Sequence, residues 1–136
     1  MLRFLIVGLA NGLLFGTLDG LINVNALARK LLEVYRPIAR TAINIPAGIL
    51  IDLAWGLVMG FVFLLLYGSW PGRTGLVKGL VFALIVWFFR VVMNAASTGM
   101  MFRVPMATLA YLVLAGLVEM LILGVVYGLF LKPLPR

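Results

Sequence analysis

The sequence predicts an all-α membrane protein: four transmembrane helices in a bundle, with an amphipathic interfacial helix between the first two. Of its 136 residues, 65% are hydrophobic and 11% are charged, and the mean hydropathy is +1.21. An ordinary soluble domain is about half apolar and a quarter charged. A chain this short cannot hide so much apolar surface inside a water-soluble globule. We therefore expect a single transmembrane domain over residues 1–136, located in the cell membrane.

Four stretches of the chain are long enough to cross a bilayer core, which needs about 20 mostly apolar residues per helix. The expected spans cover residues 2–24, 45–67, 76–98 and 104–131. The first also resembles a cleaved signal peptide, with Arg3 at its charged start and Ala-Leu-Ala at 26–28 as the cleavage site. Asn11, Asp19 and four glycines make a poor apolar core for such a signal, so the interpretation as a retained span is favoured.

The long connection between the first two spans predicts an amphipathic helix over residues 26–40. Its apolar face carries Leu27, Leu31, Val34, Tyr35 and Ile38. Its basic face carries Arg29, Lys30, Arg36 and Arg40, which we expect to contact lipid headgroups. Asn25 is placed to cap this helix, and Pro37 to kink or end it. A lipid-anchored connector is the favoured interpretation, and a gate or a partner-docking arm is the alternative.

Glycines recur at helical spacing in the first span, at Gly8, Gly12, Gly16 and Gly20. In a water-exposed helix each would cost about 1 kcal/mol. In lipid, small residues instead let helix backbones approach closely. Similar small-residue faces occur on the second and fourth spans, at Gly56, Gly60, Gly116 and Gly124. We expect all eight glycines to form helix-packing faces.

The second and fourth spans share short sequence features at their start, middle and end. Both open with an aliphatic–Pro pair, both contain Gly-Leu-Val at Gly56 and Gly116, and both close with Tyr-Gly at Tyr67 and Tyr127. The separation is 60 positions for the last two features. The first and third spans match less well, at a separation of 71 that pairs Asp19 with Arg90. These matches favour a tandem of two helical hairpins in parallel orientation.

Four ionisable residues fall inside the expected spans: Asp19, Asp52, Arg90 and Glu119. A central Asp or Arg costs about 2.5–3.5 kcal/mol on insertion scales, so such residues face the bundle interior and usually pair. A rise of about 1.5 Å per residue places Arg90 near the middle of the membrane, between the depths of Asp52 and Glu119. We expect an intramembrane charge network around Arg90.

Asn11 and Asn94 are predicted to complete the hydrogen bonding of this network, because unpaired polar groups are costly in lipid. Glu119 is the deepest acid and is the candidate for a protonatable or ion-binding group. A purely structural Asp52–Arg90–Glu119 network that fixes helix packing is the other interpretation. The residues alone do not decide between the two.

The orientation of the chain in the membrane is weakly specified. One side is expected to hold five basic residues, which are Arg3, Arg73, Lys78, Lys132 and Arg136. The other is expected to hold five as well, which are Arg29, Lys30, Arg36, Arg40 and Arg103. The positive-inside rule therefore hardly distinguishes the two orientations. The dense cluster of the second set favours its side as cytoplasmic, and the balance also allows insertion in both directions as an antiparallel dimer.

The residue types that are missing narrow the function. The chain contains no cysteine and no histidine, which excludes disulfides, thiolate metal sites and His-ligated haem. We find no enzyme motif and expect no catalytic residue, metal or cofactor; an intramembrane lipid enzyme is a disfavoured alternative. The net charge of +7 is interpreted as contact with anionic lipids, and no nucleic acid is expected as a partner.

The intramembrane charges and the hairpin repeat favour a homo-oligomeric transporter or channel for a small ion or solute. The alternative is a non-catalytic subunit or scaffold of a larger membrane protein complex, which the glycine faces and the basic connector support. The partners expected are membrane lipids, further copies of the chain or other membrane subunits.

Overall fold

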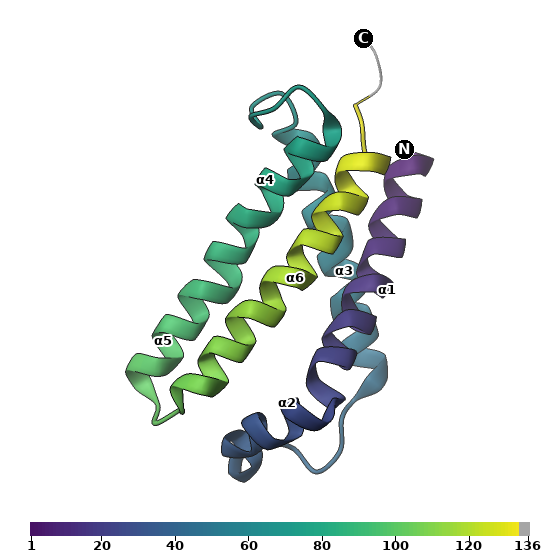
Figure 1. Cartoon of the computed structure of the whole chain (residues 1–136). Coiled ribbons are helices and arrows are strands. Elements are labelled where there is room, and N and C mark those ends of the chain that lie inside the picture. Colours follow the sequence, from purple (N-terminus) through teal and green to yellow (C-terminus); the bar gives the residue numbers. More distant parts are fainter. Residues whose placement is uncertain (134–136) are drawn as a thin grey trace.

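Four membrane-length helices run alternately in opposite directions in the computed structural model, which describes residues 1–133 (Figure 1). The elements of the spans are α1 (Leu2–Val24), α3 (Ile45–Leu65), the third span made of α4 (Gly75–Trp87), η2 (Phe88–Val92) and α5 (Met93–Met101), and α6 (Met106–Phe130). Each span is long and apolar enough to cross a membrane, and no strand occurs in residues 1–133. The predicted fold class, an all-α bundle of four spans, is confirmed.

The two ends of the bundle differ. The start of α1, the end of α6 and the 66–74 connection lie together at what we call the terminal end (Figure 1). The α2 end holds α2 (Ala26–Leu31), η1 (Leu32–Ile38) and the short 102–105 turn (Figure 1). The observed helix limits differ from the predicted ones by up to three residues. The largest difference is in the third span, which continues to Met101 instead of ending at residue 98.

The interfacial segment is not one helix over residues 26–40. Asn25 caps α2 as predicted, because its side-chain oxygen accepts a hydrogen bond from the Ala28 N–H at 2.9 Å. The α-helix ends at Leu31 and the chain continues as the 3₁₀-helix η1. Pro37 in η1 cannot donate the α-helical bond to residue 33, and its ring would clash with that carbonyl.

α2 is docked on the rest of the protein. The Thr108 hydroxyl of α6 donates to the Leu31 carbonyl at 2.8 Å, and Ala28 is fully buried. The Tyr111 hydroxyl donates to the Ile22 carbonyl at 2.6 Å, just before α2 begins. These bonds hold α2 against the start of α6, so the segment is a fixed part of the bundle.

Glycines bring two pairs of helices into backbone contact: α1 with α3, and α4 with α6. A Cβ atom on Gly56 would collide with the backbone of Gly8 and Gly12. In the second pair, a Cβ on Gly79 would collide with the Gly124 carbonyl. Gly75 and Gly128 meet in the same way, and neither was among the predicted packing glycines.

The remaining predicted glycines vary in what they face. Gly16 lies against the Asp52 side chain, Gly60 faces Tyr127 and Leu131, and Gly116 lies against Val91. Gly20 has no neighbouring atom within 4 Å of the position that its Cβ would take. The packing expected of Gly20 is therefore not found within the described chain.

The pairing of α1 with α3 and of α4 with α6 is the pairing expected of two hairpins. The residues that correspond by their helix contacts, however, are not those that correspond in the sequence match. Gly56 faces Gly8 and Gly12, and Gly124 faces Gly79 and Ala83 in the equivalent pair of helices. By contact, therefore, Gly56 corresponds to Gly124, whereas the sequence match pairs it with Gly116. The two alignments differ by eight residues, about two helical turns. The internal repeat stays a prediction.

α6 is the central helix and lies between α1 and the α4–α5 span (Figure 1). One core cluster contains Phe15, Ala83, Met120 and Leu123. A second cluster, toward the terminal end, contains Phe63, Phe82, Tyr127 and Leu131. We call this second set the aromatic cluster. It packs the terminal end of the bundle.

Candidate functional site

Arg90 lies in η2, a single π-helical turn within the third span. The Met93 N–H donates to the Phe88 carbonyl, five residues earlier. Such turns are rare and occur frequently at functional sites. The Arg90 Nη1 lies 3.5 Å from Glu119 Oε2 of α6, which forms an ion pair inside the membrane-spanning bundle.

The two partners of this pair differ in burial. The Glu119 side chain is 4% exposed, and its Oε1 has no hydrogen-bond partner in the part of the chain that the structure describes. The Arg90 side chain is 33% exposed. The buried carboxylate therefore has Arg90 as the partner that balances its charge, whereas the guanidinium is also partly exposed.

Two aromatic rings complete the surroundings of Arg90. Its guanidinium carbon lies 4.5 Å from the centre of the Phe15 ring of α1 and 4.9 Å from that of Trp55 of α3. A cation within about 6 Å of a ring face is attracted by the ring quadrupole. Contacts from α1, α3 and α6 thus converge on one side chain of the third span. Neither Phe15 nor Trp55 was among the predicted site residues.

The other two acids of the predicted network lie near this pair without joining it. The Asp52 carboxylate of α3 lies against Gly16 of α1. Asp19 lies about one turn after Gly16 on α1 and is exposed to a groove. Within residues 1–133, Arg90 forms its ion pair with Glu119 and with neither Asp19 nor Asp52. The structure thus places one acid, not three, in direct contact with Arg90.

The two asparagines have different surroundings. Asn11 is buried and donates from Nδ2 to the Leu123 carbonyl of α6 at 3.3 Å, while its Oδ1 has no partner among the described residues. It therefore connects α1 to the backbone of α6 and does not bond to the charged residues. Asn94 is exposed and lines the same groove as Asp19.

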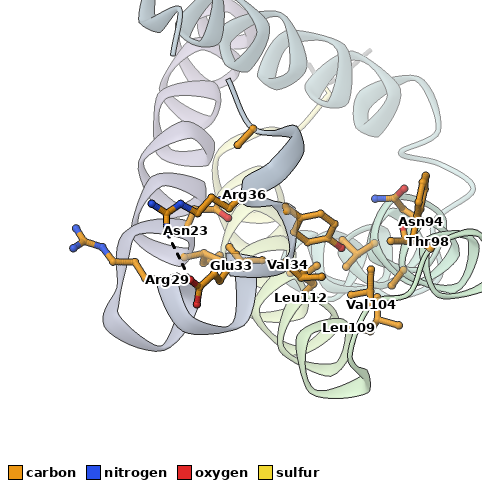
Figure 2. Close-up of a pocket in the computed structure, with 18 of the residues that line it drawn as sticks. Asn23, Arg29, Glu33, Val34, Arg36, Asn94, Thr98, Val104, Leu109 and Leu112 are labelled. Carbon is orange, nitrogen blue, oxygen red and sulfur yellow. Dashed lines mark ion pairs between the residues drawn. The ribbon is translucent and has the colours of Figure 1, made fainter. Parts of the chain in front are cut away.

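A groove of about 1530 Å³ opens at the α2 end and reaches the ion pair. We call it the α2-side groove; it lies between the end of α1, α2 with η1, and the η2, α5 and α6 segments. Arg90 and Glu119 are both among its lining residues. Figure 2 shows part of the groove lining, with Asn23, Glu33 and Arg36 on one side and Asn94 and Thr98 on the other. Apolar residues, among them Leu109 and Leu112, also line it.

Charge along the groove is predominantly positive. The basic lining residues are Arg29, Lys30, Arg36, Arg90 and Arg103. The acidic lining residues are Asp19, Glu33 and Glu119, so five cations face three acids. Arg36 and Glu33 form an exposed pair at 3.7 Å. Arg40, predicted to contact headgroups with the other basic residues of its segment, is not among the lining residues.

Within residues 1–133, no group of three or more Asp, Glu, His or Cys side chains is placed to hold a metal ion. What the arrangement offers is an ion pair inside the bundle, joined to the α2 end by a wide, positively charged groove. The chain matches no protein-family model, no curated protein and no solved structure with which it was compared.

Proposed function

We propose that this membrane protein is a small homo-oligomeric transporter or channel of the cell membrane. The α2-side groove is its entrance, and the Arg90–Glu119 pair is the inner end of that entrance. The observation that carries the proposal is that both members of an intramembrane ion pair line the groove. Charged residues within spans are expensive, and they commonly mark substrate or ion pathways.

The two ends of the bundle support a state that is open on one side. The groove lies at the α2 end, whereas the aromatic cluster fills the bundle toward the terminal end. The π-helical turn lines the inner end of the groove, and such turns occur frequently at functional sites. A transporter that works by alternating access passes through such one-sided states.

Flux through proteoliposomes tests the proposal. Vesicle swelling in iso-osmotic potassium chloride, potassium phosphate and sodium glutamate is followed by light scattering. We expect flux of at least one probe, lowered by about tenfold or more in Arg90→Gln and in Glu119→Gln. Arg73→Gln is the matched control, because Arg73 is exposed and lies at the terminal end.

Helicity and size-exclusion profiles must match those of the natural sequence before flux values are compared. Absence of flux for all three salts in the natural sequence would overturn the proposal. So would equal flux in the two site variants and the Arg73→Gln control.

A second candidate is a non-catalytic subunit or scaffold of a larger membrane complex. Gly20 of α1 and Gly48 of α3 face open space and would allow the backbone of another helix to approach. Purification in mild detergent separates the candidates. Stoichiometric partner proteins would favour the scaffold, and an oligomer of this chain alone would favour the transporter.

A further inference from the structure

We infer that the α2-side groove admits a lipid with an anionic, phosphate-bearing headgroup. This inference rests on the proposed function, because it names the class of molecule that the same groove takes. The first argument is size. The groove measures about 1530 Å³, whereas pockets for small molecules are typically about 300–1,000 Å³. An inorganic ion would fill only a small part of it.

The second argument is the chemistry of the lining. The floor is apolar, with Val104, Leu109 and Leu112 from the start of α6 and the turn before it. Asn94 and Thr98 of α5 form a polar wall (Figure 2). A surface that is apolar on one side and polar on another suits an amphiphile better than a fully hydrated solute.

The third argument is charge. Five basic residues face three acidic ones along the groove, and neither Lys30 nor Arg103 forms an ion pair within the described part of the chain. Guanidinium groups bind phosphate oxygens through paired hydrogen bonds. The surplus of unpaired cations is therefore complementary to a phosphate headgroup.

The fourth argument is position. The basic lining residues of α2 and η1 belong to the segment that connects two spans, so they lie at the level of the headgroups. The groove continues from there to Arg90, inside the bundle. A headgroup can thus enter from the membrane surface while its acyl chains stay against apolar residues. Inorganic phosphate shares the headgroup chemistry but gains nothing from the apolar floor.

Lipid binding to the full chain in detergent tests the inference. Native mass spectrometry measures the affinity for phosphatidylglycerol and for phosphatidylcholine, with inorganic phosphate as a third arm. We expect tighter binding of phosphatidylglycerol, weakened roughly tenfold to thirtyfold in the double variant Lys30→Gln, Arg103→Gln, since each cation near the surface contributes to lipid attraction. The double variant Arg73→Gln, Lys132→Gln removes the same charge outside the groove and should bind as the natural sequence does.

A measurement without variants guards against misfolding. Raising the salt concentration should weaken phosphatidylglycerol binding and leave phosphatidylcholine binding unchanged. Equal affinity for the two lipids, equal loss in the two double variants, or competition by millimolar inorganic phosphate would overturn the inference. Selective lipid binding without flux would contradict the proposed function alone. Flux that depends on Arg90 without lipid selectivity would contradict this inference alone.

Discussion

The unequal burial of Arg90 and Glu119 decides what each contributes to the stability of the bundle. The carboxylate is almost fully buried and has one oxygen without a partner in the described chain. Without Arg90 its charge would be left alone in a medium that solvates it poorly. If Glu119 were neutral, the guanidinium would still face the groove and would still contact the rings of Phe15 and Trp55.

We therefore predict that Arg90→Met lowers the free energy of unfolding by about 3–5 kcal/mol, the usual cost of breaking a buried pair from one side. Glu119→Gln should cost clearly less. The double variant should be more stable than Arg90→Met alone, because it no longer buries an unpaired carboxylate. Unfolding in detergent followed by tryptophan fluorescence measures all three. Equal losses in the two single variants would contradict this account.

The sequence predicted a charge network around Arg90 because a charge in lipid needs a partner and the depth of each residue follows from the helical rise. It could not separate Glu119 from Asp52 as the partner of Arg90. Depth fixes position along the bundle, whereas contact also depends on how each helix is rotated. Phe15 and Trp55 carried no signal, because an aromatic residue within an apolar span looks like any other lipid-facing residue.

At the scale of helices, close glycine contacts define which spans pair. The fourfold glycine row of α1 was readable from its spacing, and Gly8 and Gly12 do meet Gly56. The equivalent contact of α4 with α6 uses Gly75 and Gly79, too few glycines to stand out. The π-helical turn and the change from α2 to η1 were not predicted either, since hydropathy does not distinguish one helical hydrogen-bond pattern from another.

These contacts predict a sharp difference between two identical substitutions on α1. Gly12→Leu should destabilise the protein by more than about 3 kcal/mol, because its side chain would enter the backbone of Asp52 and Leu53. A Cβ atom at Gly20 would have no neighbouring atom within 4 Å, so Gly20→Leu should be neutral or stabilising by up to about 1 kcal/mol. Thermal unfolding monitored by circular dichroism compares them. Similar midpoints would show that the α1–α3 contact is wrong.

At the scale of the whole molecule, the four spans place the start of α1 and the end of α6 at the same end of the bundle. Basic residues lie at both ends of the bundle. Composition and hydropathy were enough to predict this architecture, since so apolar a chain has few other ways to fold. The groove could not be predicted from the sequence. It depends on α2 docking beside α6 and on the path of α5, both set by contacts between segments far apart in the chain.

We predict that the chain inserts in both orientations, which the balance of basic residues at the two ends allows, although the basic cluster of residues 26–40 favours its own side as cytoplasmic. Because the natural sequence has no cysteine, single cysteines at Ser69 and Thr41 report on the two ends without background. Both positions are exposed. We expect a membrane-impermeant maleimide to label each variant partly in sealed vesicles, with detergent-opened vesicles as the control. Complete labelling of one and none of the other would show a single orientation.

The π-helical turn makes the effect of a one-residue deletion in the third span depend on where the deletion falls. The bond from Met93 to Phe88 accommodates one residue more than an uninterrupted α-helix would hold. Each residue turns a helix by about 100°. A deletion of a single codon within 88–92 would therefore convert the turn to α-helix and keep Asn94 and Thr98 facing the groove, whereas a deletion within the α-helical residues 76–87 would rotate them away from it. Hydropathy would hardly change in either case, so hydropathy does not distinguish a deletion that the π turn absorbs from one that changes which residues face the groove.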